Sequence, residues 1–142
     1  MTYLDKTKLC FVVGPLGEED SEIRIHADWL LEEIIDPVFK DFPEYNVVRA
    51  DKITQPGMID AQIIRNLIDA DLVIADLSSL NPNAFYEIGI RHMVQKPIIH
   101  MQLAQDKIPF DVRLYRATKF SRARPSDLRR AREELKQVII SR

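Results

Sequence analysis

The chain has 142 residues, of which 46% are hydrophobic and 30% are charged. This length suits a single domain with its own core, and the composition is that of a globular protein rather than a disordered one. The formal net charge of −2 provides no global field that would draw the chain to nucleic acid or to an anionic membrane. We therefore expect one domain over residues 1–142 and neither of these partners.

The sequence also indicates a reducing compartment. Its one cysteine, Cys10, lies inside the apolar run 9–13, so no disulfide can form within the chain. No apolar stretch approaches the roughly 18 residues of a membrane span, and the start of the chain lacks the apolar region of a signal peptide. A cytoplasmic location is the simplest expectation.

Strands and helices alternate along the chain. Runs rich in Val and Ile predict strands, and apolar residues three and four apart predict amphipathic helices. Strands are expected at 8–13, 46–50, 72–77, 97–101 and within 111–120, and helices at 21–39, 58–68, 81–96 and 125–140. Because parallel strands need crossover helices, this order predicts an α/β fold with a mostly parallel sheet of four or five strands and helices on both faces. The layout is a three-layer domain of the flavodoxin-like or Rossmann-like kind.

Ligands of open parallel sheets bind beyond the carboxyl ends of the strands, and the first loop at such an end contains two glycines. It consists of Gly14, Pro15, Leu16 and Gly17 and leads into a helix. Glycines permit close backbone approach, and the amides at a helix N-terminus suit a phosphate. The acidic residues 18–20 oppose an anion unless Arg24, one turn into the helix, offsets them. The loop is therefore either a phosphate contact or a simple turn.

Polar residues also gather after the third strand. Asp76 ends that strand, so we expect its carboxylate at the carboxyl edge of the sheet. Asn81 and Asn83 stand at the start of the next helix, and Glu87 follows one turn later. Residues four apart share a helix face, so Asn83, Glu87 and Arg91 are expected to form a polar stripe that can face a cleft. The structural alternative is an ion pair between Glu87 and Arg91, with Asn81 as a helix cap.

A carboxylate at the mouth of such a cleft can break an N-glycosidic bond. It attacks or stabilises the anomeric carbon in an oxocarbenium-like transition state, as carboxylates do in glycoside hydrolysis. Glu87 suits this role, and Asp76 would hold the base or the sugar hydroxyls, or protonate the leaving base. No metal or other cofactor is expected, because the three histidines lack ligand spacing and the cysteine is alone. His92, on the apolar side of its helix, is expected to be a satisfied core histidine.

Five motifs along residues 8–115 carry a family resemblance. They are Phe11-Val-Val-Gly-Pro-Leu-Gly17, Ser21-x-x-Arg24-x-x-Ala27-Asp28, Asp71-Leu-Val-Ile-Ala-Asp76-Leu-Ser78, Asn81-Pro-Asn-Ala-Phe-Tyr-Glu87-Ile-Gly89 and Pro109-Phe-Asp111-x-Arg113. Together they resemble the nucleoside 2-deoxyribosyltransferase-like proteins and the TIR-like nucleotide-binding domains close to them. The resemblance implies that Glu87 is the nucleophile that takes a ribose or deoxyribose from a base, and that Asp76 contacts the nucleoside. It also implies that the loop from Gly14 to Gly17 lies against the sugar or phosphate.

We therefore expect cleavage or transfer of the N-glycosidic bond of a nucleoside, a nucleotide or an NAD-like molecule, the last as an NADase. The residues expected to complete the substrate site are Arg24, Ser78, Asn81 and Asn83. The alternative is a non-catalytic nucleotide sensor of the same fold, which could signal to an effector partner protein. The resemblance further implies a homo-oligomer and suggests a place in bacterial antiphage defence. A response-regulator-like module would fit the layout, but the block from Asn81 to Gly89 has no place in it.

Overall fold

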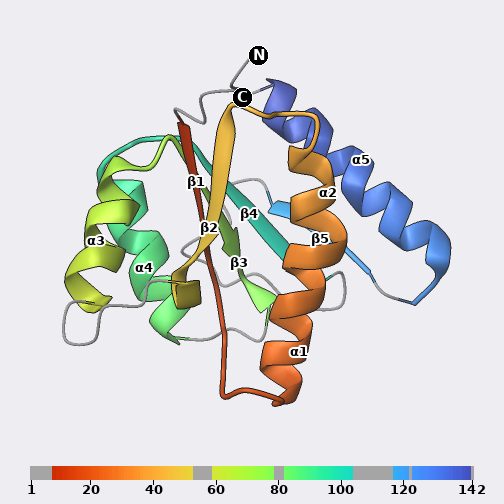
Figure 1. Ribbon diagram of the computed structural model, residues 1–142, viewed down its shortest axis with the longest axis horizontal. Coiled ribbons are helices and arrows are strands. Elements are labelled where there is room, and N and C mark those ends of the chain that lie inside the picture. The colour runs from red at the N-terminus through yellow and green to blue at the C-terminus, as the bar shows by residue number, and fades with distance from the viewer. Residues whose placement is uncertain (1–7, 53–58, 79–81, 104–116, 122, 142) are drawn as a thin grey trace, which may run out of the picture.

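The computed structural model describes residues 8–52, 59–78, 82–103, 117–121 and 123–141. Its centre is a five-stranded sheet in the order β2-β1-β3-β4-β5, and every pairing in it is parallel (Figure 1). The strands are β1 (Lys8–Val13), β2 (Tyr45–Arg49), β3 (Leu72–Asp76), β4 (Ile98–Leu103) and β5 (Ala117–Phe120). This is the strand order of flavodoxin-like sheets.

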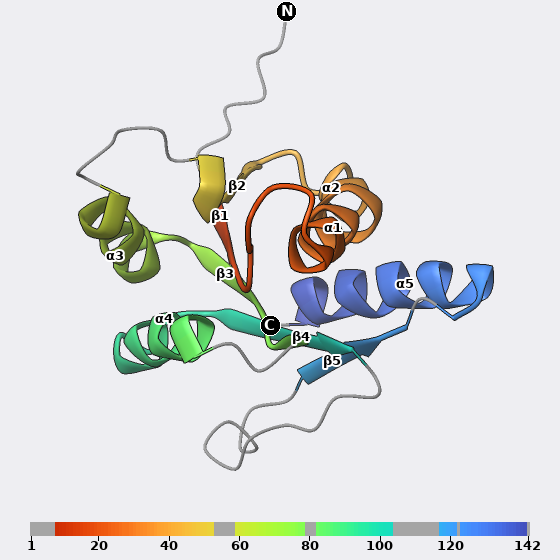
Figure 2. The same ribbon diagram turned by 90° about the horizontal axis from the view of Figure 1, so that it is seen from below.

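Helices cover both faces of the sheet, as Figure 2 shows. One face carries α1 (Glu22–Trp29), α2 (Asp36–Phe39) and α5 (Pro125–Ser141), and the other carries α3 (Ile59–Asp69) and α4 (Pro82–Met93). The central strand β3 therefore has a buried side chain at every position. Leu72 and Ile74 join the core beneath α1, α2 and α5, whereas Val73 and Ala75 join the core beneath α3 and α4, because successive side chains of a strand point to opposite faces.

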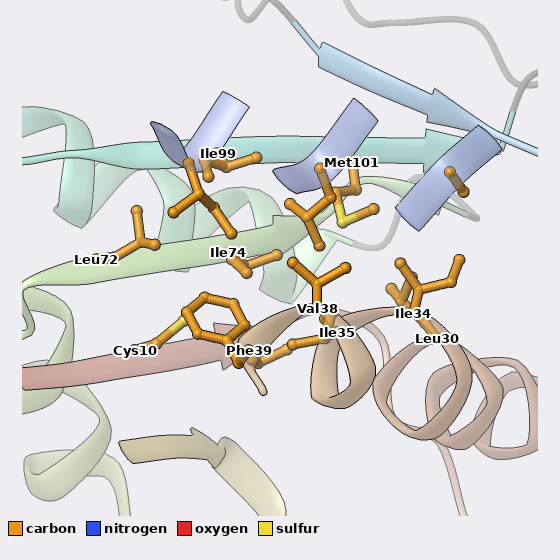
Figure 3. Close-up of a cluster of buried hydrophobic side chains, with 14 of the residues drawn as sticks. Cys10, Leu30, Ile34, Ile35, Val38, Phe39, Leu72, Ile74, Ile99 and Met101 are labelled. Atoms are coloured by element: carbon orange, nitrogen blue, oxygen red, sulfur yellow. The ribbon is translucent and has the colours of Figure 1, made fainter. Parts of the chain in front are cut away.

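The first crossover is a continuous helical run with a π-helical segment in its middle. α1 begins after Ser21, whose Oγ accepts a hydrogen bond from the amide of Arg24 at 3.2 Å, a regular N-cap. Residues Leu30–Ile35 are π-helical, and α2 continues the run to Phe39. Side chains from this run meet those of β1, β3 and β4 in the first core, which Figure 3 shows in close-up. The predicted helix at 21–39 is confirmed, and the π-helical segment in it was not predicted.

The predicted α/β fold is confirmed, and the chain adopts its five-strand form. The bounds of β2, β3 and β4 differ from the prediction by one or two residues. β5 takes only the end of the predicted region 111–120, and residues 111–116 lie outside the described residues. Within the described ranges, no helix is both long and apolar enough to cross a membrane. The carboxyl ends of the strands and the starts of α1 and α4 meet at one edge, at the lower end of Figure 1.

Candidate active site

The loop after β1 passes tightly against the end of β3. A Cβ atom added to Gly14 would lie 2.7 Å from Cβ of Asp76, which is closer than two carbon atoms can pack. Gly17 has φ +61, a left-handed conformation that glycine adopts without penalty. Pro15 is buried and Leu16 is half-buried between them. The two glycines thus let the loop lie directly beside Asp76.

Arg24 holds this loop in place. Its Nε donates to the carbonyl of Leu16 at 3.0 Å, and its Nη2 donates to the carbonyl of Gly17 at 3.1 Å. Its Nη1 lies 3.8 Å from Oδ2 of Asp51, after β2. The guanidinium is half-buried, and it contacts oxygens of the first loop on one side and of Asp51 on the other. Its predicted contact with a substrate stays a prediction.

Asp76 is buried at the end of β3, with 3% of its surface exposed. Its Oδ2 lies 2.9 Å from Nε2 of His26, in the second turn of α1. Its Oδ1 accepts a hydrogen bond from the backbone amide of Ser78 at 2.9 Å. Ser78 is itself completely buried. Both carboxylate oxygens of Asp76 therefore have partners within the protein.

Glu87 lies in the second turn of α4 and is half-buried. Burial raises the pKa of its carboxyl from 4.5 to about 7, and no charge among the described residues contributes to the shift. Within the described ranges, no hydrogen bond or ion pair engages this carboxyl. A group of this kind is ionised in about half of the molecules at neutral pH, and perturbed carboxyls of this kind are frequent in active sites.

The predicted polar stripe on α4 is wrong at Arg91. This side chain is completely buried. Its Nη1 donates to the carbonyl of Leu67 in α3 at 3.1 Å, and its Nη2 donates to the carbonyl of Pro97 at 2.8 Å. The alternative ion pair with Glu87 is also wrong, because those carbonyls take the guanidinium, and its lowered pKa comes first from burial with no contribution from Glu87. Arg91 binds α4 to α3 and to the start of β4.

Asp76 and Glu87 approach the site from opposite faces of the sheet. Asp76 follows Leu72 and Ile74 in steps of two residues along β3, so its side chain points to the same face of the sheet as theirs. On that face it contacts His26 of α1. Glu87 is one turn before Arg91 on α4, and residues four apart share a helix face, so Glu87 faces the side of α3. The two carboxyls can therefore reach a common ligand only across the carboxyl edge of the sheet. Their predicted partnership on a sugar stays a prediction.

Two further predicted contacts cannot be placed. Asn81 lies outside the described residues, as does the motif at 109–113. Asn83 is in the first turn of α4, and its side chain is outside the described part of the chain. Both asparagines stay predictions.

Sequence reasoning missed Arg49, which is buried at the end of β2. Its guanidinium makes hydrogen bonds of 2.6 and 2.8 Å to the carboxylate of Asp51 and a 2.7 Å ion pair with Asp28. Its pKa is raised, chiefly by the hydrogen bond to Asp51. The only signal in the sequence was a charged residue inside the otherwise apolar end of a predicted strand. Through Asp51, Arg49 is linked to Arg24 and hence to the first loop.

A small cavity lies beneath the first loop. It is lined by residues that include Gly14, Pro15, Leu16, Arg49 and Asp76, and its volume is about 10 Å³. A single buried water needs roughly 10–15 Å³ on this measure. This space is too small for a sugar or a base.

The histidines do not form a metal site in the described part of the chain. No group of three or more His, Cys, Asp or Glu side chains there could hold a metal ion. His92 is half-buried, and its Nε2 lies 3.0 Å from Nε2 of the buried His100. His92 therefore has a partner, as predicted, but it is half-buried rather than part of the core. Burial, with the neighbouring His92 second, lowers the pKa of His100 to about 4.

Solved structures of other proteins share this architecture, among them three enzymes. The chain matches a 2-deoxyribosyltransferase from Bacillus psychrosaccharolyticus with a TM-score of 0.60 and 11% identity, over 87% of this chain and 90% of that one. It matches a CMP N-glycosidase from Clostridium botulinum with a TM-score of 0.54 and 14% identity, over 87% and 97%. The 2-deoxyribosyltransferase from Leishmania mexicana gives 0.53 and 17%, over 78% and 73%. The chain has the fold of the 2-deoxyribosyltransferases.

The resemblance that the motifs suggested is thus confirmed at the level of the fold. No protein-family model and no curated protein sequence matches the chain. At 11–17% identity, the likeness to the deoxyribosyltransferase fold concerns architecture, and the chemistry has to be argued from the residues.

Proposed function

We propose that the protein cleaves or transfers the N-glycosidic bond of a nucleoside or nucleotide, with Glu87 as the nucleophile. The observation that carries this proposal is the carboxyl of Glu87: it is half-buried, its pKa is raised to about 7, and no ion pair in the described ranges neutralises it. A structural carboxylate would gain stability from a partner. A poorly hydrated carboxylate without one is suited to nucleophilic attack.

The reaction would proceed in two displacements. An ionised oxygen of Glu87 attacks the anomeric carbon while the bond from that carbon to the base breaks. The electron pair of that bond leaves with the base, which takes up a proton. Water or a second base then attacks the anomeric carbon of the resulting ester, restores the carboxylate of Glu87, and passes its proton to the solvent.

The remaining predicted residues would bind the substrate around this carboxyl. Asp76 would contact the nucleoside, and Ser78, Asn81 and Asn83 would line the same edge. The loop from Gly14 to Gly17, braced by Arg24, would lie against the sugar or phosphate. The solved enzymes of this fold include a CMP N-glycosidase, which supports nucleotides among the substrates to be tested.

The first test measures release of free base. The purified protein is incubated with 2′-deoxynucleosides, nucleoside 5′-monophosphates and NAD, and products are separated by chromatography. We expect release from a nucleoside or nucleotide, and we expect Glu87→Gln to lower kcat at least about 1000-fold because the amide cannot form the ester. The control is Glu134→Gln, the same change at an exposed position on α5.

The same assay, repeated over a range of pH, tests whether Glu87 acts in its ionised form. Because the attacking carboxyl must be ionised, kcat/KM should rise as the pH rises through about 7. A rate that falls over this interval would identify Glu87 as an acid instead. Release that is undiminished in Glu87→Gln contradicts the nucleophile assignment. Binding of a nucleotide without release from any substrate would favour the non-catalytic sensor.

A further inference from the structure

His26 is the one histidine at the carboxyl edge of the sheet among the described residues. It lies in the second turn of α1 and is 7% exposed. Its ring stacks on Phe120 of β5, with centroids 5.8 Å apart and an interplanar angle of 21°. The ring of Trp29 lies 6.4 Å away on the same helix. This packing leaves the imidazole little freedom to turn, because rotation would break the stack on Phe120.

The fixed ring points its Nε2 at Asp76. The distance from Nε2 to Oδ2 is 2.9 Å, and both side chains are buried. The loop after β1 packs against this residue, since a Cβ atom added to Gly14 would lie 2.7 Å from Cβ of Asp76. The backbone amide of Ser78 donates to the other carboxylate oxygen, Oδ1. These two hydrogen bonds hold the carboxylate of Asp76, and His26 supplies the one that comes from a side chain.

The surroundings of Nδ1, the other ring nitrogen of His26, indicate which nitrogen carries the proton. Nδ1 is buried and has no hydrogen-bond partner in the described part of the chain. A proton on Nδ1 would be a buried donor without an acceptor among the described residues, which is unfavourable. A proton on Nε2 is accepted by Asp76. The hydrogen bond between the two side chains therefore favours a proton on Nε2, with Oδ2 of Asp76 as its acceptor.

We propose that His26 is a positioning residue for the N-glycosidic chemistry, an inference that rests on the proposed function of Glu87. It fixes the carboxylate of Asp76 at the end of β3 through Nε2, and through Asp76 it fixes the amide of Ser78, where the chain turns toward α4 and Glu87. His26 connects the α1 face of the sheet to the loop that leads to the nucleophile on the other face. It does not contact the substrate itself.

Two substitutions separate this role from a merely structural one. In His26→Gln, the side-chain amide nitrogen can take the place of Nε2 and still donate to Asp76. In His26→Asn, the shorter amide reaches only the position of Nδ1 and leaves Asp76 without its donor. Both variants lose the ring and its stacking, so the difference between them reports the hydrogen bond.

We expect His26→Asn to lower kcat/KM about 10- to 100-fold, the range that a small misplacement of a contacting group produces, and His26→Gln to recover most of this loss. Both are measured well below their midpoints of thermal unfolding. Equal losses in the two variants would show that the ring and its stacking matter rather than the hydrogen bond. No loss in either variant would show that Asp76 needs no positioning. Either result overturns the inference.

Side-chain ¹⁵N NMR of histidine provides a readout that needs no activity. We expect His26 in the Nε2–H tautomer, and we expect Asp76→Asn to perturb both His26 and the amide of Ser78. A proton on Nδ1 would overturn the inference even in an active enzyme. An inactive wild-type protein would refute the proposed function and with it a role for His26 in catalysis, while the tautomer would still decide whether the contact between His26 and Asp76 exists.

Discussion

At the scale of single residues, the candidate site keeps groups in states that a purely structural protein would avoid. Glu87 is a half-buried carboxyl without an ion pair in the described ranges. His26 has a buried nitrogen without a partner there. Each such group reduces the free energy of unfolding, and groups of this kind persist chiefly where function requires them.

Glu87→Gln should therefore stabilise the protein in alkaline solution. The folded-state pKa of about 7 lies above the unfolded value of 4.5, so the stability that protonated Glu87 contributes is complete below pH 4.5 and is lost as the pH rises through 7. After allowance for solvent screening, we expect Glu87→Gln to raise the free energy of unfolding by about 1–2 kcal/mol at pH 8. Urea denaturation measures this gain.

The comparison at pH 4 is the internal control for that experiment. There the wild-type carboxyl is protonated in both states, so the amide should offer almost no gain. Glu134→Gln, at an exposed position, should change the stability little at either pH. A gain of equal size at pH 4 and pH 8 would contradict the assigned pKa of Glu87.

At the scale of elements, α4 is placed by a charged residue in the core. The carbonyl of Leu67 belongs to the last turn of α3, where carbonyls have no partner within the helix, and Arg91 supplies one. The same guanidinium bonds the carbonyl of Pro97, just before β4. Arg91 therefore sets the position of α4 relative to α3 and the sheet, and with it the position of Glu87.

Arg91→Met should destabilise the protein by about 2–4 kcal/mol, because it removes the donor to the buried carbonyl of Leu67 and the donors to the part-buried carbonyl of Pro97. The shift in the urea midpoint, at an unchanged slope, measures this loss. Arg129→Met on α5 is the matched control, since Arg129 is exposed and its replacement should cost less than about 0.5 kcal/mol. A loss in Arg91→Met no larger than in the control would show that these hydrogen bonds do not anchor α4.

At the scale of the whole molecule, two buried groups give opposite dependences of stability on pH. The folded-state pKa of His100, about 4, is below the unfolded value of 6.5. Its contribution is present above pH 6.5 and is lost as the pH falls toward 4. Glu87 loses its contribution as the pH rises from 4.5 toward 7. The two contributions oppose each other between pH 4.5 and 6.5.

Removing the titration of Glu87 should make the contribution of His100 to the pH dependence of stability measurable. In Glu87→Gln, the stability should fall by roughly 3 kcal/mol more between pH 7 and pH 4 than in the double variant Glu87→Gln with His100→Gln. The difference between their pH slopes, rather than either absolute stability, isolates His100. Identical slopes would contradict the lowered pKa of His100. If His100→Gln does not fold, His100→Asn provides the same comparison.

Most of the fold was predictable from the sequence. The Val- and Ile-rich runs and the helical spacing of apolar residues predicted most of the described strands and helices, because these periods are properties of short segments. The parallel sheet followed from their alternation. The 3-10 helix Ala50–Lys52 and the π-helical turn at Leu30–Ile35 were not predicted, because the apolar spacing carries no separate signal for either.

The candidate site was predictable in its location and less so in its contacts. The meeting of Gly14, Asp76 and the start of α4 at the carboxyl edge follows from the chain order of the elements, because strand ends of a parallel sheet share that edge. Three features became visible only in the folded molecule: Asp76 pairs with His26, 50 positions away, Arg91 turns into the core, and Asp76 and Glu87 lie on opposite faces. These outcomes depend on burial and on contacts between distant segments, for which a local pattern carries no signal.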